Sequence, residues 1–380
     1  MQFPIDRFKD ISTPFYYYDL SLLRATLEII NENSDYPGFH VHYAVKANSN
    51  PELMRIISSY GLGADVVSGG EIERAIECGF DPAEIVYAGV GKTDKEIRYA
   101  LEKGVGCLNV ESLEELEVIS ALAEDCGIKA KVSLRVNPEI DAHTHHYITT
   151  GLAENKFGID KSRILEIARR CVADPWIEFR GLHCHIGSQI TIEDPFVALC
   201  ERINDFQRQF EAAGIAIPII NVGGGLGIDY ENPDENPIPD FQKYFNTFRD
   251  NLDLREGQEL HFELGRSITG QCGSLICRTL FIKNGVNKKF LIVDGGMTDL
   301  IRPALYQAHH KIENISSDST EKAMYDVVGP ICESSDVFGT AELLPITRRG
   351  DFIALRSAGA YGEVMSSRYN CRQLPGCVLG

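Results

Sequence analysis

Residues 40–78 read HVHYAVKANSNPELMRIISSYGLGADVVSGGEIERAIEC. The stretch begins with an apolar run over 40–48 that is typical of a buried strand, and residues 51–59 then follow a helical period. The same order repeats at once, with a strand pattern over 61–67 and a helical pattern over 70–78. Strands that alternate with helices favour an α/β fold with a parallel sheet.

The alternation continues well beyond this stretch. Further strand patterns occupy 85–89, 107–111, 131–137, 180–187, 217–223 and 259–265. Further helical patterns occupy 94–103, 112–125, 161–173, 194–213 and 240–252. Eight strand–helix units in about 240 residues predict a (β/α)8 barrel of the α/β class.

The pattern changes after residue 266. Four stretches there favour strands with few helices between them, at 268–282, 288–294, 324–329 and 351–358. The aromatic run over 14–18 is also strand-like. We therefore predict a barrel domain over 21–266 and a mostly β domain built from residues 1–20 and 267–380.

Composition limits the classes of function. The chain has 380 residues, of which 44% are apolar and 24% charged, as in ordinary globular proteins. Lys and Arg number 37 against 55 Asp and Glu, so the net charge is −18. An acidic surface repels nucleic acid and anionic lipid, and no apolar run is long enough to span a bilayer. We expect neither a nucleic-acid partner nor a membrane partner.

The cysteines and the first residues indicate the compartment. The eleven cysteines form no C-x-x-C pair, which argues against a zinc ribbon and a disulfide framework. Residues 1–7 show no basic segment followed by an apolar run, so a signal peptide is not expected. A cytoplasmic protein with reduced thiols fits both observations.

Polar residues gather where the predicted strands end, which is where barrels carry their reactive groups. The residues at these positions are Lys46, Asp65, Arg135, Asn137, His185, Ser188, Gly223, Gly224, Gly225, Glu263 and Arg266. A lysine at the end of a buried strand is costly to keep charged, and a lowered pKa would make it a good amine nucleophile. Lys46 is therefore either a Schiff-base lysine or a side chain that reaches out to solvent.

The other groups also allow two interpretations. The run over 223–227, GGGLG, would let backbone N–H groups approach a phosphate, or it is a turn without a ligand. Glu263 would hold a pyridine nitrogen protonated, or it forms a buried ion pair with Arg266 or Arg135. His183 and His185 lack the further ligands of a metal site, and a stacked imidazole suits His185 better. The histidines at 143, 145 and 146 fit no closed zinc pattern.

Seven motifs in order resemble those of the diaminopimelate decarboxylase family. They are HYAVKAN (42–48), HIGSQ (185–189), GGGLG (223–227), ELGR (263–266), DGGMTDLIRPALY (294–306), GPICESSD (329–336) and GAYGEVMSSRYN (359–370). Enzymes of this kind use pyridoxal 5'-phosphate (PLP) on an alanine-racemase-like barrel with a C-terminal β domain. The chain departs from the usual pattern at Leu264, where the family has proline.

The resemblance implies a role for each matching residue. Lys46 would hold PLP covalently, and Cys332 would donate the proton after CO2 leaves. The residues implied in cofactor binding are Lys46, Asp65, Arg135, His185, Ser188, Gly223, Gly224, Gly225, Glu263, Gly265, Arg266 and Tyr361. Those implied in substrate binding are Arg266, Arg302, Tyr306, Glu333 and Tyr361. Because Cys332 and Glu333 come from the partner subunit in the family, a homodimer with shared sites is implied.

The implied reaction is decarboxylation of meso-diaminopimelate to L-lysine, the last step of lysine biosynthesis. Decarboxylases of ornithine, arginine or carboxynorspermidine are the nearest alternatives, but the first two have substrates with no distal carboxylate for Arg302 to bind. Alanine racemase fits less well, because that family places Arg at the pyridine nitrogen where this chain has Glu263. A non-catalytic PLP-binding protein would lack the β domain that carries Cys332 and Tyr361.

Overall fold

The computed structural model describes residues 2–140 and 156–380. These residues divide into two compact units, and each is described by itself. The barrel unit comprises residues 27–227 and 240–265, and the β unit comprises 1–26, 228–239 and 266–380. The loop 228–239 thus groups with the β unit, which the linear order of elements did not suggest. The domain boundaries predicted at residues 21 and 266 stay a prediction.

The barrel unit is a closed barrel of eight strands in the order β2 to β9, and each strand is parallel to its neighbours. The strands are β2 (Phe39–Ala44), β3 (Gly63–Val66), β4 (Ile85–Tyr87), β5 (Cys107–Val110), β6 (Ala130–Arg135), β7 (Ile177–His183), β8 (Ile219–Asn221) and β9 (Glu259–Leu264). The first strand pairs with the last, with His42 opposite Glu263, and this pairing closes the barrel. The predicted (β/α)8 barrel is confirmed.

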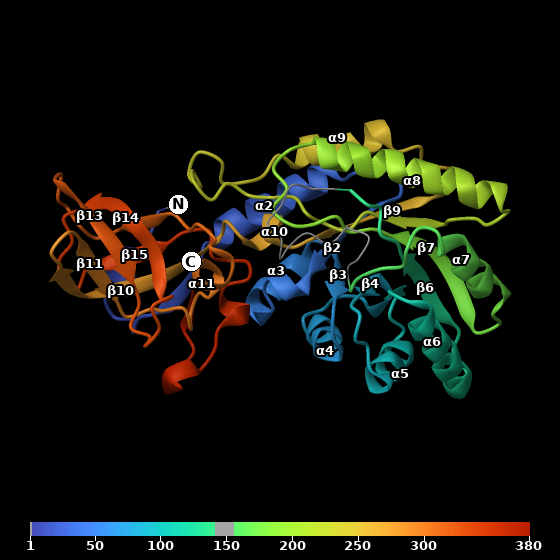
Figure 1. Cartoon of the computed structure of the whole chain (residues 1–380), viewed down its shortest axis with the longest axis horizontal. Helices are drawn as coiled ribbons and strands as arrows, with labels where there is room; N and C mark the ends of the chain where they lie inside the picture. The colour runs from blue at the N-terminus through green and yellow to red at the C-terminus, as the bar shows by residue number, and fades with distance from the viewer. Residues whose placement is uncertain (1, 141–155) are drawn as a thin grey trace. The chain divides into compact units, whose positions relative to one another are not determined.

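Helices lie on the outside of the strands (Figure 1). They are α3 (Pro51–Ser59), α4 (Gly69–Glu77), α5 (Asp94–Lys103), α6 (Leu113–Cys126), α7 (Ile164–Ala173), α8 (Asp194–Ala212) and α9 (Phe241–Asn251), with a 3-10 turn η2 at Pro82–Glu84. Their start signals are local: Thr93 and Glu96 form a capping box for α5, and Gly104 ends that helix in the left-handed conformation. α9 packs its aromatic face on β9, where Phe245 lies 5.0 Å from Phe262 between ring centroids.

The β unit contains an eight-stranded sheet whose main path runs β12-β15-β10-β11-β13-β14. The aromatic strand β1 (Phe15–Tyr18) joins it by pairing with β10 and with β16 (Gly376–Leu379). The other strands are β10 (Gly273–Asn284), β11 (Lys289–Val293), β12 (Ile312–Asn314), β13 (Lys322–Val328), β14 (Val337–Pro345) and β15 (Phe352–Leu355). Helical segments are short: α1 (Ile5–Phe8), α10 (Arg266–Thr269), α11 (Arg302–Tyr306), η3 (Glu363–Met365) and η4 (Tyr369–Cys371), while α2 (Leu20–Asn33) crosses the unit boundary.

Two expectations about strands were wrong in detail. The strand predicted over 268–282 starts only at Gly273, because residues 266–269 form the short buried helix α10. The strand predicted over 40–48 ends at Ala44, and Val45–Ala47 forms the 3-10 turn η1. Apolar composition does not separate a strand from a buried turn of three residues. In the described part of the chain, no helix has the length and apolar character needed to cross a membrane.

Candidate active site

Lys46 and Asp65 form a pair at the carboxyl ends of two neighbouring strands. Lys46 lies in η1, just after β2, and its Nζ donates a hydrogen bond of 2.7 Å to Oδ2 of Asp65 on β3. Asp65 is fully buried. Burial, followed by the negative charge of Glu263, raises the pKa of Asp65 to about 6, although Lys46 opposes the shift. The pair therefore holds an amine against a carboxyl group that accepts a proton readily.

Glu263 is a buried carboxylate near the end of β9. Its Oε1 accepts hydrogen bonds from Nδ2 of Asn221 at 2.8 Å and of Asn109 at 3.3 Å. Its Oε2 lies 3.1 Å from Nε2 of His183. Burial alone would raise the pKa of Glu263, but His183 and then Lys46 outweigh burial and hold it well below its usual range. Glu263 is therefore a fixed negative charge inside the barrel rim.

The residues that hold Glu263 are not among the predicted site residues. Asn109, His183 and Asn221 lie on β5, β7 and β8, near the ends at which the candidate residues gather. Each is a polar residue in an otherwise apolar strand, and that signal alone could have identified them. His183 had been considered only as a metal ligand. Nδ1 of His183 is buried and has no hydrogen-bond partner, so the ring interacts with Glu263 through Nε2 alone.

Arg135 pairs with a different carboxylate from the one considered. Its Nη1 donates to Oε1 of Glu111 at 2.8 Å, and both side chains are buried. Glu111 also accepts hydrogen bonds from the backbone N–H of Gly89 and of Gly158. The interpretation in which Arg135 forms an ion pair with Glu263 is therefore wrong, because the guanidinium of Arg135 is bonded to Glu111 instead.

The glycine run lies against the ends of β7 and β9. A Cβ on Gly223 would stand 2.6 Å from the carbonyl oxygen of Cys184, and one on Gly224 would stand 2.0 Å from that of Glu263. Gly223 and Gly225 also have φ values of +68° and +113°, which only glycine adopts without strain. The glycine run therefore leaves backbone N–H groups at the rim without side chains around them. Such a backbone can approach a phosphate more closely than one that carries side chains.

His185, Ser188 and Gly265 lie at the same end of the barrel. Nδ1 of His185 accepts a hydrogen bond of 3.3 Å from the N–H of Gly224. Burial, and then the positive charges of Arg135 and Lys46, hold the pKa of His185 well below its usual range, so the ring is neutral. Ser188 follows β7 by a few residues. A Cβ on Gly265 would meet that of Ala47 at 2.9 Å, so Gly265 packs directly on the turn that carries Lys46.

The β unit has its own cluster of candidate residues. Arg266 and Arg302 each donate an Nη1 hydrogen bond of 2.6 Å to the hydroxyl of Tyr230. The guanidinium of Arg266 also lies 4.9 Å from the ring centre of Tyr361. Burial would raise the pKa of Tyr230, but the two guanidinium groups outweigh burial and lower it. The cluster therefore unites three predicted residues around Tyr230, which the sequence analysis did not select; Tyr306 ends the same short helix as Arg302.

Cys332 and Glu333 are exposed in the β unit. The backbone N–H of Cys332 donates to the side-chain oxygen of Asn370 at 3.3 Å. Glu333 accepts a hydrogen bond of 2.5 Å from the hydroxyl of Tyr369. Both contacts join the GPICESSD segment to the RYN segment at residues 368–370. The histidines at 143, 145 and 146 lie outside the described residues.

The rim residues fit PLP. A half-exposed amine beside a buried carboxyl group, an ionised carboxylate, a neutral imidazole and a glycine cradle are the groups that the cofactor's aldehyde, ring nitrogen, ring face and phosphate require. Buried polar atoms without a partner lie there too, namely Oδ1 of Asp65 and Nδ1 of His183.

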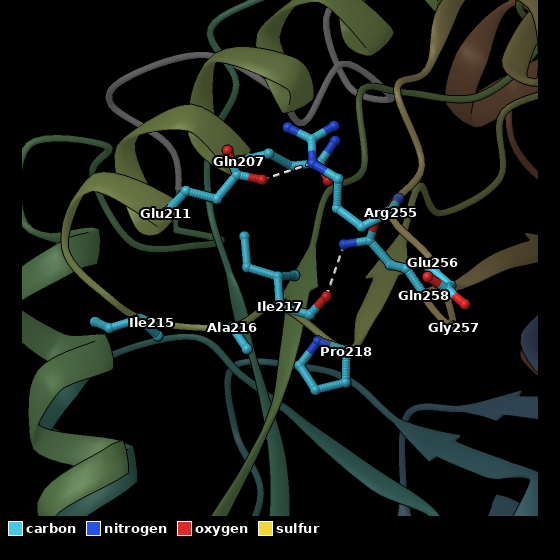
Figure 2. Close-up of a pocket in the computed structure, with 10 residues that line it drawn as sticks. All are labelled: Gln207, Glu211, Ile215, Ala216, Ile217, Pro218, Arg255, Glu256, Gly257 and Gln258. Atoms are coloured by element: carbon cyan, nitrogen blue, oxygen red, sulfur yellow. Dashed lines mark hydrogen bonds and ion pairs between the residues drawn. The ribbon is translucent and has the colours of Figure 1, made fainter.

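A separate pocket, of about 260 Å³, lies at the other end of the barrel strands, where β8 and β9 begin (Figure 2). It is lined by Gln207, Glu211, Arg255 and Gln258 among others, with Glu211 bonded to Arg255. None of the predicted cofactor or substrate residues lines it.

Comparisons with known proteins agree with this chemistry. A family model described as "Pyridoxal-dependent decarboxylase, pyridoxal binding domain" matches residues 25–270. The chain is 58% identical to the diaminopimelate decarboxylase of Bacteroides thetaiotaomicron over 377 residues, covering 98% of this chain and 97% of the relative. It is 42% identical to that of Vibrio cholerae over 361 residues, covering 95% and 85%.

Solved structures give the same result. The diaminopimelate decarboxylase of Helicobacter pylori complexed with L-lysine has a TM-score of 0.93 and 39% identity, covering 99% of this chain and 93% of the other. The lysine/ornithine decarboxylase of Vibrio vulnificus complexed with putrescine has a TM-score of 0.85. Its identity is only 22%, so that likeness shows a common fold alone.

Proposed function

The chain belongs to the diaminopimelate decarboxylase family of pyridoxal-dependent decarboxylases, and from this premise we propose which of its residues carry the reaction. It decarboxylates meso-diaminopimelate to L-lysine and CO2 with PLP as its cofactor, the last step of lysine biosynthesis. The observation that supports the residue roles best is the rim of the barrel, where the half-exposed Lys46 bonds to the buried Asp65 and both interact electrostatically with the buried Glu263.

The proposed cofactor contacts follow from that rim. Lys46 would hold the cofactor covalently through Nζ, while Asp65 and Arg135 would orient the lysine and the ring. Glu263 would hold the ring nitrogen protonated, and His185 would contact the face of the ring. The phosphate is held by Ser188, by Gly223, Gly224 and Gly225, and by the backbone of Gly265 and Arg266, while Tyr361 contacts the cofactor. When bound, PLP supplies an electron-accepting ring that takes up the electron pair released as CO2 departs.

The barrel residues act on charge and protons. Lys46 gives up a proton when its amine becomes a nucleophile, and Asp65, which lies 2.7 Å away and has a raised pKa, is an acceptor within hydrogen-bond distance. Glu263 stays ionised because His183, Asn109 and Asn221 bond to it. A fixed negative charge at the ring nitrogen stabilises the transition state without any rearrangement of the protein.

The substrate contacts are proposed in the β unit. Arg302 binds the distal carboxylate, Glu333 the distal amine, and Arg266, Tyr306 and Tyr361 the remainder of the substrate. Support comes from Tyr230, whose hydroxyl accepts from Arg266 and Arg302 at 2.6 Å each and so sets the two guanidinium groups side by side. Two adjacent guanidinium groups suit an anionic substrate better than the purely cationic ends of ornithine or arginine.

The experiment that tests the substrate is direct. The PLP-loaded protein is incubated with meso-diaminopimelate, ornithine, arginine and carboxynorspermidine in turn, and the amine product and released CO2 are measured. L-Lysine from meso-diaminopimelate at the highest kcat/KM is expected. A higher value on another substrate would assign the chain to that reaction, and PLP binding without CO2 release would mark a non-catalytic protein.

We expect Arg302→Ala to lower kcat/KM for meso-diaminopimelate by about 10- to 100-fold, because a hydrogen bond to a charged group contributes about 1.5–3 kcal/mol. Activity on ornithine, which has no distal carboxylate, should change much less. Cofactor content, read by absorbance, should stay at the wild-type level. The matched control is Arg349→Ala, in which the lost guanidinium is exposed and donates only to the carbonyl of Leu280. Equal kcat/KM in wild type and Arg302→Ala would remove Arg302 from the substrate site.

The homodimer with shared sites is also proposed. Cys332 donates the proton after CO2 leaves, and its exposure, together with that of Glu333, is what a residue lent to a partner's site requires. A cytoplasmic location is proposed on the eleven cysteines, all of which are free thiols.

A mixing experiment tests the shared site. Inactive Lys46→Ala and inactive Cys332→Ala proteins are combined under conditions that exchange subunits. A mixed dimer rebuilds one site with neither change, so partial recovery of CO2 release is expected. Absence of recovery, after exchange has been verified with differently tagged subunits, would mean that each chain completes its own site.

A further inference from the structure

A cluster of histidines and one glutamate lies at the end of the barrel strands opposite to Lys46. His40 on β2 stands directly opposite His261 on β9 in the strand register, and Glu259 lies two residues before His261 on the same face of β9. One ring nitrogen of His40, one of His261 and one carboxylate oxygen of Glu259 all lie within 4.8 Å of one another. The cluster belongs wholly to the barrel unit and takes no part in the proposed reaction.

The hydrogen bonds behind the cluster fix where the ring protons lie. Nδ1 of His42 is 3.1 Å from the carbonyl oxygen of Glu84, which can only accept, so Nδ1 carries the proton. In a neutral ring with its proton on Nδ1, Nε2 of His42 is an acceptor. Nε2 of His42 is 2.9 Å from Nδ1 of His261, and His261 must therefore donate from Nδ1.

This chain of hydrogen bonds places two lone pairs opposite each other, one on His261 and one on Glu259. With its proton on Nδ1, a neutral His261 turns the lone pair of Nε2 toward Oε2 of Glu259, 3.1 Å away. An ionised carboxylate only accepts hydrogen bonds, so Glu259 offers a lone pair as well. Two lone pairs at that distance repel each other unless a positive species stands between them. Either an additional proton on His261 or a bound cation satisfies the geometry.

The position of His40 favours the bound cation over the additional proton on His261. A proton between His261 and Glu259 needs no third group, yet the ring of His40 lies 4.9 Å from that of His261, centre to centre. His40 therefore offers a third ligand atom within 4.8 Å of the other two. Glu84 adds negative charge, with Oε2 4.0 Å from Nδ1 of His40. The nearby Arg180 is paired with Glu178 at 3.0 Å, so a cation would not face an unneutralised guanidinium.

We propose that His40, Glu259 and His261 bind a zinc-class divalent cation, with water as the fourth ligand and His42 as the group that orients His261. Two imidazoles and one carboxylate form a ligand set for Zn²⁺ or Co²⁺ and not for the harder Mg²⁺. A metal-bound histidine that donates its other N–H to a fixed acceptor is the usual arrangement.

The ligand atoms would have to draw together by on the order of 1 Å, because bonds of about 2.0–2.1 Å place tetrahedral ligands roughly 3.3 Å apart. His40 and Glu259 are able to move, since their side chains are 38% and 39% exposed. His261 is the fixed member, with 9% exposure and a bond on Nδ1.

The position of the proposed metal site indicates that a bound cation stabilises the barrel. β2 and β9 are the first and last strands of the barrel, and their pairing closes it. A cation held by His40 and by His261 joins these two strands across the closing seam. The same strands lead to Lys46 and Glu263 at their other ends. The bound cation therefore stabilises the closed barrel against unfolding, since it binds the folded chain alone.

The test compares zinc binding by wild-type holoenzyme and three variants after removal of metal with a chelator. Calorimetric titration with Zn²⁺ is expected to show one more site per chain in wild type than in His40→Ala or Glu259→Gln. Loss of a ligand should weaken binding by more than the roughly 10- to 100-fold that outer-shell changes produce. Zn²⁺ should also raise the melting temperature of wild type and not of His40→Ala, and Mg²⁺ should do neither.

The matched control is His309→Ala. His309 is another half-exposed histidine beside a glutamate, with Nε2 3.3 Å from Oε2 of Glu231, and it lies outside the cluster. This variant should bind zinc as wild type does. The eleven cysteines are common to all four proteins, so zinc bound by thiols contributes equally to the zinc stoichiometry of each. Equal zinc stoichiometry in wild type and His40→Ala would overturn the proposal and leave a protonated His261 as the explanation. Activity is not part of the readout, so the result is independent of the proposed reaction.

Discussion

Lys46→Ala is expected to abolish decarboxylation, with kcat at least about 10³-fold below wild type, a loss of roughly 4 kcal/mol in transition-state stabilisation. The change removes the only amine placed against Asp65, at 2.7 Å, in the part of the barrel that the structure describes. It also leaves a buried Asp65 beside the negative charge of Glu263 without the ammonium group that opposes the rise of its pKa, so the pKa of Asp65 should rise further. The measurement is CO2 release together with the visible absorbance of the lysine-bound cofactor.

The variant Lys46→Arg separates the ion pair with Asp65 from the covalent role of the lysine amine. Arginine can keep the ion pair with Asp65 but provides no amine for covalent attachment, so it too should be inactive. Reduction of the wild-type holoenzyme with borohydride, followed by peptide mapping, should place the cofactor on Lys46. The internal control is Lys92, a lysine that is 1% exposed and bound to Glu115 at 2.6 Å. Label on Lys92, or activity in Lys46→Arg, would contradict the assignment.

Glu263→Gln is expected to lower kcat by about 10²–10³-fold, the range seen when one preorganised electrostatic contact is removed. Glutamine has the same shape and can still accept from Asn109 and Asn221, but it carries no charge to keep the ring nitrogen protonated. The cofactor should still bind, because the glycine run and Lys46 are unchanged. Steady-state kinetics on meso-diaminopimelate and cofactor content by absorbance are the two readouts.

A second variant shows whether the charge of Glu263 is what matters. His183→Gln weakens the contact that lowers the pKa of Glu263 but leaves the carboxylate in place, so its kcat should fall between wild type and Glu263→Gln. The matched control is Glu178→Gln, which changes a half-exposed glutamate near the start of β7 that pairs with Arg180. A Glu263→Gln enzyme with wild-type kcat and full cofactor would show that the ring nitrogen needs no carboxylate here.

The barrel was predictable because it depends on local pattern. Strands and helices alternate with their own periods, and the chemistry of barrels sits where strands end, so Lys46, Asp65, His185 and Glu263 could be selected by position alone. Tyr230 could not be selected in that way. It lies in a loop that groups with the β unit, and its value comes from Arg266 and Arg302, which are distant from it in sequence.

By itself, the sequence determined the alternation of elements, the acidic surface and the ordered motifs, because each is encoded in neighbouring residues. Only the tertiary structure decided which charges meet. Arg135 pairs with Glu111 and leaves Glu263 to His183, and His40 faces His261 across the seam that closes the barrel. The physical reason is that a buried charge takes its partner from whichever strand lies beside it, and the order of strands around a closed barrel joins residues that are more than 200 positions apart in the chain.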